Sequence, residues 1–506
     1  MITLILLAPI VLPCLGALGY LTIGWRRETA WLSALTSVLG LVAAIVLAVR
    51  ITGSGAQTAL DGLFRADELS VFVLIVIGSV ATLATTATPS YLRTEIEAGR
   101  ASTRTASRHN LLVQLFLATM AAAVLASNLG MLWVTIEATT ILTAFLVGQR
   151  RTRQAVEAAW KYVVICSTGI ALALLGTLLL NYAFAHAAPE AGLDLARMTA
   201  EASELDPSVT RIAVLLLFLG FGTKAGLAPM HAWLPDAHSQ APAPVSALMS
   251  GVLLSVAFYA VLRVQVISAE ALGPDFARTL LAAMALGSLV VAASLMLAQG
   301  DYKRMLAYSS IEHLGLVCLG AAIGGQLALS AVLLHMLGHG LVKAVLFLSA
   351  GRILQVTGTS RIDAVRGLAT RAPLLAGCFG FGVLALIGLP PFSIFASELG
   401  IARAGLGAGT GYALVTVTAL LLILVIAGAM VGHTSRMLLG EPSGAPVGDQ
   451  VRATGGPLRT RPAAELATSE ATALVGGLAA CALIGIAAGP LSTLLHQAAQ
   501  IITGTS

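Results

Sequence analysis

The chain has 506 residues, of which 57% are hydrophobic and 10% are charged, and its mean hydropathy is +0.90. This composition excludes a water-soluble protein of this length, because such a protein needs far more polar surface. The net charge of +5 is carried by loops between apolar stretches and does not require a nucleic-acid partner.

Apolar stretches long enough to cross a membrane follow one another along the chain. A spanning helix needs about 20 apolar residues. On this measure we predict an all-α polytopic membrane protein with about 14 transmembrane helices. The predicted spans are 3–24, 31–49, 69–88, 111–127, 129–148, 159–184, 212–238, 244–266, 278–299, 305–324, 327–351, 373–402, 411–435 and 471–495. The first span has no basic region before it, so we expect a retained helix rather than a cleaved signal.

Basic residues alternate between the predicted loops. Nineteen follow the odd-numbered helices: Arg26, Arg27, Arg93, Arg100, Arg104, Arg108, Arg150, Arg151, Arg153, Lys303, Arg304, Arg352, Arg361, Arg366, Arg371, Arg436, Arg452, Arg459 and Arg461. Only seven follow the even-numbered helices: Arg50, Arg65, Arg197, Arg211, Arg263, Arg278 and Arg403. The positive-inside bias puts both termini on the outer side. We expect a multi-pass protein of the bacterial cytoplasmic (inner) membrane.

Only four of the 29 basic residues are lysines, and two of these lie within apolar spans. Lys224 and Lys343 are at membrane depth, Lys161 is at the edge of a span, and Lys303 is expected in a loop. A charge at the centre of a bilayer costs about 2.5–3.5 kcal/mol on insertion scales, so an ionisable group there is a functional candidate. Lysine can release its proton, whereas arginine cannot. This distribution predicts a proton path.

The seventh predicted helix, 212–238, is interrupted by proline. Pro229 and Pro235 remove backbone donors from an otherwise apolar run. The same segment holds four ionisable side chains, Lys224, His231, Asp236 and His238, of which Lys224 and His231 are candidates for proton translocation. Unwound backbone at membrane depth is tolerated only where it is buried or lines a wet cavity. We therefore interpret this helix as broken around an ion path, with ordinary proline kinks as the alternative.

The twelfth predicted helix, 373–402, has a matching break. Gly388, Pro390 and Pro391 precede Glu398, which is the only ionisable residue between 373 and 402. Two proline-broken helices five spans apart are typical of inverted repeats with the ion site at the break. The predicted division is helices 1–3 in 1–110, a first repeat of helices 4–8 in 111–266, a second repeat of helices 9–13 in 278–435, and a loop with helix 14 in 436–506. Glu398 at the surface near a helix end is the alternative.

Three further predicted helices carry ionisable groups. In the eleventh, His335, His339 and Lys343 fall at i, i+4 and i+8 and so share one face. This face predicts a proton relay, because imidazole exchanges protons near neutral pH. A zinc site would need further ligands, and a structural histidine pair is the other alternative. The remaining candidates are Glu312 and His313 in the tenth helix and Glu137 in the fifth, for which we expect an ion pair with Lys224.

No pattern for a cofactor is present. The cysteines are scattered singly and form no C-x-x-C: Cys14, Cys166, Cys318, Cys378 and Cys481. There are therefore no ligands for an iron–sulfur cluster. The Walker, G-x-S-x-G and strand-linked G-x-G-x-x-G motifs are also missing from the sequence. We expect no cofactor, no metal, and no redox or catalytic centre of its own.

Four motifs resemble the antiporter-like subunits shared by respiratory complex I, Mrp-type sodium/proton antiporters and membrane-bound hydrogenases. They are WVTIEATTI, FGTKAGLAPMHAWLPDAHSQAPAPVSALMSG, DYKRMLAYSSIEHLG and LHMLGHGLVKAVLFLSAG, and the resemblance covers at least 110–435. Within this group the chain is most similar to hydrogenase-4 component F, from the membrane arm of formate-hydrogenlyase-type complexes. The resemblance implies a proton-translocation role for these matching residues: Glu137, Lys224, His313, His335, His339, Lys343 and Glu398.

The resemblance leaves several functions open. The leading prediction is a proton-translocating subunit of a redox-driven complex, of the complex I-like or group 4 nickel–iron hydrogenase type. The alternatives are a sodium/proton antiporter component and the proton-channel partner of an inorganic-carbon uptake enzyme. Each implies other membrane subunits as partners, including homologous antiporter-like subunits and a hydrogenase or quinone-reductase module, with lipid around them. Protons are the expected ion, with sodium as the alternative.

Overall fold

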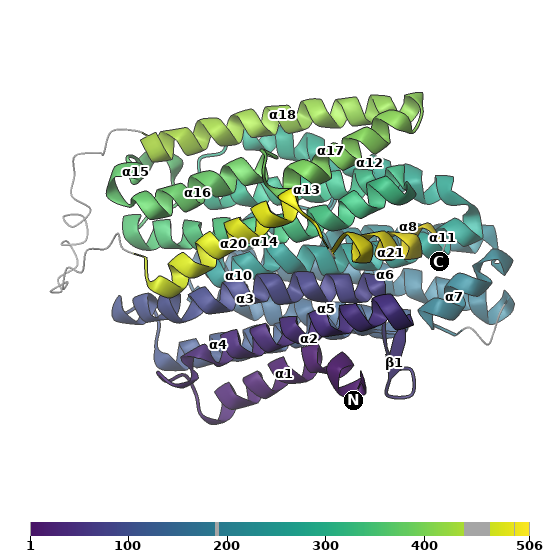
Figure 1. Cartoon of the computed structure of the whole chain (residues 1–506), viewed down its shortest axis with the longest axis horizontal. Helices are drawn as coiled ribbons and strands as arrows, with labels where there is room; N and C mark the ends of the chain where they lie inside the picture. The colour runs from purple at the N-terminus through teal and green to yellow at the C-terminus, as the bar shows by residue number, and fades with distance from the viewer. Residues whose placement is uncertain (1, 188–191, 440–465, 490, 505–506) are drawn as a thin grey trace.

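The computed structural model of the chain describes residues 2–187, 192–439, 466–489 and 491–504. Most of these residues form helices that run side by side (Figure 1). The α-helices are α1 Ile2–Thr22, α2 Leu32–Ser54, α3 Glu68–Glu97, α4 Thr103–Leu125, α5 Leu129–Val147, α6 Arg153–Ala187, α7 Leu195–Glu201, α8 Pro207–Lys224, α9 Trp233–Gln240, α10 Ala243–Leu248, α11 Leu254–Leu272, α12 Pro274–Met296, α13 Tyr302–Ile323, α14 Gly325–Thr357, α15 Leu368–Arg371, α16 Pro373–Leu386, α17 Ser393–Gly407, α18 Thr410–Leu439, α20 Thr468–Ile486 and α21 Leu491–Thr503.

The number of membrane crossings agrees with the prediction of about 14. Within the described residues, 13 helices are long and apolar enough to span a membrane. One further crossing is made by α16 and α17, which follow one another across a short break. Both ends of the described chain lie toward the right-hand end of the helix array in Figure 1. This position is the one expected for an even number of crossings.

The central helices are shielded and the outer ones are exposed. The apolar windows of Ala243–Leu272 and α13 are 100% buried, and that of α14 is 94% buried. By contrast, α1 and α18 are only 28% and 22% buried, and they lie at opposite edges of the array in Figure 1. Polar side chains on the central helices are therefore kept away from lipid, where unsatisfied polar groups are costly.

Side chains at the ends of the helices help to fix where they begin. A carboxylate, amide or hydroxyl accepts a backbone N–H at the start of six helices: Asp67 (α3), Ser102 (α4), Asn128 (α5), Asp194 (α7), Asp206 (α8) and Asp301 (α13). Such caps satisfy donors that have no partner within the helix. The only sheet in the described chain is a two-stranded antiparallel hairpin of β1 (Gln57–Ala59) and β2 (Phe64–Ala66), which pairs Thr58 with Arg65.

The seventh span is broken, as predicted, but not at both prolines. α8 ends at Lys224 and α9 begins at Trp233, so Pro229 lies in the unwound segment between them. Pro235 is in the first turn of α9. Its missing N–H costs nothing there because first-turn donors have no partner within the helix. The prediction that Pro235 interrupts the helix was wrong.

The twelfth span breaks where the sequence indicated. Gly388, Pro390 and Pro391 all lie between the end of α16 at Leu386 and the start of α17 at Ser393. Gly388 has φ +71°, a conformation that favours glycine. Each of the two broken spans thus contains a short unwound segment next to ionisable side chains.

Two predicted boundaries were wrong at the ends of helices. The last span does not run to 495: α20 ends at Ile486, and α21 is a separate amphipathic helix. The apolar face of α21 packs on α3 and α14, and a helix that lies along such a surface needs only one apolar stripe. Lys303, expected in a loop, lies in the first turn of α13 and is only 1% exposed.

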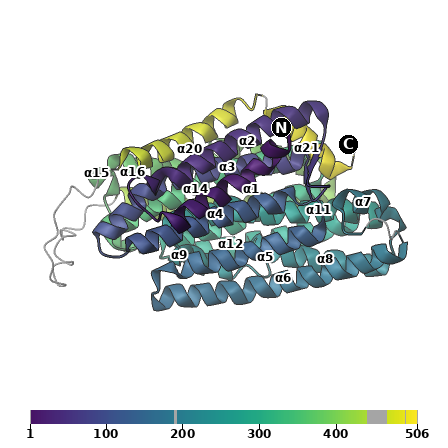
Figure 2. The same cartoon turned by 90° about the horizontal axis from the view of Figure 1, so that it is seen from below.

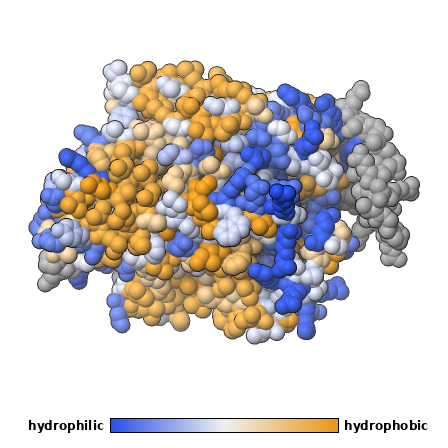
Figure 3. Space-filling view, turned by 180° about the vertical axis from the view of Figure 1, so that it is seen from behind, coloured by the Kyte–Doolittle hydropathy of each residue, from blue (hydrophilic) through white to orange (hydrophobic). Residues whose placement is uncertain are grey.

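The surface separates into an apolar belt and a charged end. In Figure 3 apolar residues cover much of the molecule, and hydrophilic residues gather toward the right-hand end, which is the left-hand end of Figure 1. Loops that follow odd-numbered spans, such as those between α3 and α4 and between α12 and α13, lie at that end (Figure 1). Arg452, Arg459 and Arg461 of the predicted basic set lie outside the described residues.

Candidate ion-translocation site

Lys224 is buried at the end of α8 and is held by hydroxyl groups. Its Nζ donates to Thr140 Oγ1 at 2.7 Å and to Tyr162 OH at 2.5 Å. Tyr162 also shares a hydrogen bond with Thr143 Oγ1 at 2.5 Å. α5 supplies both threonines, α6 the tyrosine and α8 the lysine, and these helices lie side by side in Figure 2. The lysine therefore has neutral partners that can accept or pass on a proton.

The expected ion pair between Glu137 and Lys224 is not present. No ion pair within 4.0 Å in the described chain includes Glu137, and its Oε2 is buried without a hydrogen bond. The carboxylate still interacts electrostatically with Lys224. Glu137 and Thr140 are one turn apart on α5, and Thr140 lies at the level of the ammonium group. Thr140 therefore bonds the Lys224 ammonium group, the role that the sequence suggested for Glu137.

Aromatic rings of α9 lie between this lysine and the middle of the protein. The Trp233 ring centroid is 5.0 Å from that of Tyr162 and 6.4 Å from that of His238, and its Nε1 donates to Thr223 O at 2.9 Å. His238 stacks on Phe347 of α14 at 5.1 Å. Both ring nitrogens of His238 are buried without a partner in the described structure. An imidazole in this state can exchange protons with water.

His238, rather than His231, is the histidine of α9 that faces the centre. His231 is half-buried in the break, and its Nδ1 has no hydrogen bond in the described chain. His238 interacts electrostatically with Lys343, and His339 interacts in turn with His238. Both histidines are in the same motif, and His231 is the one predicted from the sequence as the candidate for proton translocation. Only the start of α9 at Trp233 decides which one points inward.

Three histidines meet at the centre of the molecule. His313 Nδ1 and His335 Nε2 share a hydrogen bond at 3.0 Å, and the His313 and His339 rings are 5.2 Å apart. Lys343 follows one turn after His339, and its Nζ donates to Leu306 O at 2.7 Å. All of these side chains are at most 1% exposed. His335, His339 and Lys343 thus share one face of α14, as predicted, and His313 of α13 packs against that face.

The central histidines continue toward the second break. His335 Nδ1 shares a hydrogen bond with Ser397 Oγ of α17 at 2.9 Å, and Glu398 is the next residue. The Glu398 carboxylate occupies the space that a side chain on Gly388 would need. Glu312, which is 4% exposed, interacts electrostatically with Glu398 and Lys343. Glu312 is therefore within electrostatic range of both the central lysine and the carboxylate at the break.

Two basic residues at the start of α13 hold the end of α9, and sequence reasoning missed both. Lys303 donates to the carbonyls of Ser239 at 2.8 Å and Ala241 at 3.0 Å, which are otherwise unpaired at a helix end. Arg304 bonds Asp236 Oδ1 at 2.5 Å, and Asp236 Oδ2 also accepts from Lys161 of α6 at 3.2 Å. The only signal in the sequence was Asp236 inside an apolar run.

A π-turn brings α11 close to the central histidines. Met249–Leu253 forms this turn between α10 and α11, and Ser250 Oγ shares a hydrogen bond with Ser310 Oγ at 2.8 Å. A side chain added to Gly340, next to His339, would lie 2.8 Å from Gly251 O. π-turns are frequent at functional sites. In the described residues, no three His, Cys, Asp or Glu side chains are arranged to hold a metal.

Residues 126–423 match the family described as "NADH:quinone oxidoreductase/Mrp antiporter, TM". The chain belongs to this family of multi-pass membrane proteins. Among its relatives is the hydrogenase-4 component F homolog of Methylacidiphilum infernorum, which is 38% identical over 396 residues, 77% of this chain and 81% of that protein. Hydrogenase-4 component B of Escherichia coli is 32% identical over 67% of this chain and 50% of that protein.

Solved structures share the whole fold. A chain of the membrane-bound sulfane sulfur reductase, an archaeal respiratory membrane complex, superimposes with a TM-score of 0.83 at 24% identity, covering 100% of this chain and 98% of that one. A chain of the Mrp complex from Dietzia sp. gives 0.83 at 21% identity, with 99% and 97% covered. A chain of respiratory complex I from Thermus thermophilus gives 0.79 at 24% identity, with 100% and 99% covered. These relatives are subunits of multisubunit membrane complexes.

Proposed function

We propose that the chain is a proton-translocating, antiporter-like subunit of a redox-driven membrane complex, of the complex I-like or group 4 nickel–iron hydrogenase type. One observation carries this proposal: a line of titratable and hydroxyl side chains runs from α5 through the centre of the protein to α17. The line is formed by Glu137, Thr140, Tyr162, Lys224, His238, His339, His313, Lys343, Glu312, His335, Ser397 and Glu398. Such groups are costly in a membrane and are retained there for function.

Proton movement along this line follows from its electrostatics. A charged Lys224 has only hydroxyl partners, so its free energy depends strongly on the charge of Glu137 nearby. When that charge is removed or compensated, the proton on Lys224 is best released toward His238 and the central histidines. Water must cross the region around Trp233, because an indole N–H is a donor only and cannot pass a proton on.

The parent complex is proposed from the relatives. The printed name of the hydrogenase-4 component F homolog favours a hydrogenase-type complex, with homologous membrane subunits beside this chain. An Mrp-type sodium/proton antiporter component is the second candidate, because the Mrp chain matches the fold as well as any of the structures compared. Radioactive sodium uptake by vesicles that contain the purified complex separates the two. Sodium uptake coupled to proton release would favour the antiporter.

We also propose the orientation in the membrane. The arginine-rich loops follow the odd-numbered spans, and basic loops stay on the cytoplasmic side. We therefore propose a bacterial cytoplasmic (inner) membrane as the location, with both termini outside. Glu137 and Lys224 then belong to the first repeat, 111–266, and Glu398 to the second, 278–435.

Substitution of Lys343 tests the proposed path. The complex is purified through a tag on this chain and reconstituted in vesicles, and proton flux under an imposed potassium diffusion potential is followed with a pH-sensitive dye. Lys343→Arg should abolish the flux, because arginine keeps the charge but cannot release the proton. The matched control is Lys161→Arg, at the half-exposed lysine of α6, which should conduct normally. Equal flux in both variants at equal subunit levels would overturn the proposal.

A further inference from the structure

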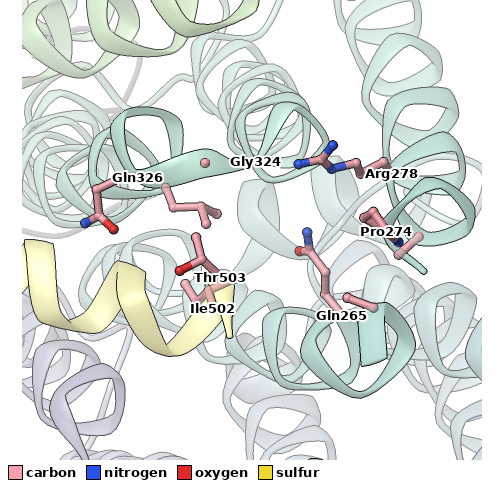
Figure 4. A pocket seen from close by; sticks show the side chains of 11 residues that line it. Gln265, Pro274, Arg278, Gly324, Gln326, Ile502 and Thr503 are labelled. Carbon is pink, nitrogen blue, oxygen red and sulfur yellow. The ribbon is translucent and has the colours of Figure 1, made fainter. Parts of the chain in front are cut away.

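A cavity of about 400 Å³ lies at the end of the helix array that carries the termini, away from the proton path. It is lined by the last turns of α11, the first turns of α12 and α14, and the end of α21 (Figure 4). Its lining is mostly apolar and includes Ala269, Leu329 and Ile502, with polar side chains from Gln265, Arg278, Gln326 and Thr503. A volume of this size accommodates a small-molecule group.

The cavity presents donors that have no acceptor in the protein. Arg278 has no hydrogen bond or ion pair in the described chain, and its guanidinium lies so close to Gly324 that an added side chain there would be 2.6 Å from Nη2. α14 begins beside it at Gly325, and no side chain caps this helix. The first N–H groups of a helix have no internal partner and attract anions.

Two of the last backbone acceptors of α13, the helix before α14, are already occupied. Gly320 O accepts from Gly324 N at 3.1 Å, and Ala321 O accepts from Gln265 Nε2 at 2.9 Å. Two carboxylates near the cavity, Glu270 and Asp275, are exposed and do not line it. Hydrogen-bond donors therefore dominate this end of the cavity, which suits an anion.

Gln265 provides an unpaired hydrogen-bond acceptor deeper in the cavity. Its side chain is 7% exposed and points into the space between α11 and α14 in Figure 4, and its Oε1 is buried without a partner. An unpaired buried acceptor costs about 1–3 kcal/mol, so a ligand that donates to it is favoured. The ligand thus combines an anionic group with a hydrogen-bond donor a few bonds away.

We propose that this cavity binds the headgroup of a phospholipid, with the phosphate at Arg278 and the N-terminus of α14 and a headgroup hydroxyl or ammonium at Gln265. The cavity lies where the apolar spans α12 and α14 begin, which is the depth of a lipid headgroup. Arginine matches phosphate oxygens in charge and geometry. The apolar lining provided by α11 and α21 suits the glycerol and upper acyl carbons.

Native mass spectrometry of the full chain in detergent tests this assignment. The chain is incubated separately with phosphatidylglycerol, phosphatidylethanolamine and phosphatidylcholine, of which the last has no headgroup donor. The first two should be retained best. Arg278→Gln should lower retention of all three about tenfold, since a charge-assisted hydrogen bond is lost. Gln265→Leu should instead remove the preference over phosphatidylcholine.

The controls separate a built site from general lipid adhesion. Arg403→Gln, at an exposed arginine outside the cavity, should retain lipid like the unmodified chain. Equal retention in Arg278→Gln and Arg403→Gln would overturn the proposal. If millimolar inorganic phosphate displaces the lipid from the unmodified chain but not from Arg278→Gln, the site binds free phosphate, and the lipid proposal is overturned. If Arg278→Gln fails to fold, Arg278→Lys keeps the charge without the planar fork and should show an intermediate loss.

Discussion

Lysine and arginine occupy different environments in this protein. Lys224 and Lys343 are fully buried and bonded to hydroxyls or a carbonyl rather than to carboxylates. The described ion pairs of arginine lie toward the helix ends, as between Arg263 and Asp67 at 2.6 Å. Burial raises the pKa of Asp67, but the Arg263 guanidinium and hydrogen bonds from Ser70 outweigh it, so the net pKa is lowered. Arginine thus pairs with carboxylates near helix ends, whereas Lys224 and Lys343 occupy the proposed path.

The hydroxyl that holds Lys224 gives the first test at this scale. Tyr162→Phe removes a 2.5 Å hydrogen bond to the ammonium group and leaves the ring in place. Because hydrogen bonds to charged groups contribute about 1.5–3 kcal/mol, we expect proton flux in vesicles to fall roughly tenfold or more. Tyr182→Phe on the same helix is the control, since Tyr182 is 54% exposed. Similar flux in the two variants would show that the hydroxyl has no role.

Glu398 gives a second test. Glu398→Gln keeps the shape of the side chain but cannot titrate, so proton flux should be severely reduced, and Glu398→Asp should be intermediate. Flux is measured with the pH-sensitive dye at matched subunit levels. The exposed Glu204 supplies the control Glu204→Gln. Normal flux in Glu398→Gln would support the alternative in which this carboxylate is only a surface group at a helix end.

Much of the candidate site could be predicted from residue types. Lys and His at membrane depth, and their helical spacing on α14, indicated the central cluster before any geometry was known. The choice of His238 over His231 could not be predicted, because it depends on where the chain resumes its helix after the break. The same is true of Thr140 and Tyr162, since hydroxyls in apolar helices are common and only packing shows which ones reach Lys224.

At the scale of elements, the second break depends on a single glycine. Gly388 has φ +71°, and the Glu398 carboxylate fills the space beside its Cα. Gly388→Ala would add about 1–2 kcal/mol of backbone strain and push the carboxylate away. We expect a lower melting temperature in detergent and reduced flux. In Gly377→Ala, within α16 and with open space around it, the melting temperature should be unchanged or higher.

Asp236 connects elements of the two predicted repeats. It accepts from Lys161 of α6 and from Arg304 of α13, so its loss should free the end of α9. Asp236→Asn should increase amide hydrogen exchange in α9 and α10 while leaving α1 and α2 unchanged. Asp363→Asn, at an exposed aspartate, is the control. Unaltered exchange in α9 would show that packing alone holds this segment.

Helix positions were predicted from apolar length, whereas the shorter elements were not. The β1–β2 hairpin and α7 have too few apolar residues to show a period, and the boundary between α20 and α21 falls within an apolar stretch. Hydropathy measures total apolar content and does not register where a helix turns to lie along a surface. The broken helices were predictable because proline changes backbone chemistry directly.

For the whole molecule, orientation is the property to measure. A C-terminal fusion to alkaline phosphatase, which is active only outside the cytoplasm, should be active, and a fusion to green fluorescent protein at the same point should be dark. The physical reason is the excess of basic residues in loops at the opposite end. A fluorescent fusion with inactive phosphatase would reverse the proposed direction of the path.

The aromatic contact between Trp233, His238 and Phe347 has a consequence for energy conservation. These rings stand between the two halves of the proposed proton line, and neither Trp233 nor Phe347 can carry a proton. A membrane that contains this protein alone would therefore lose its proton gradient only slowly, since the line is interrupted at rest. Conduction requires a transient wetting of this contact. The cost of wetting sets how much gradient is lost as leak when the partner complex is idle.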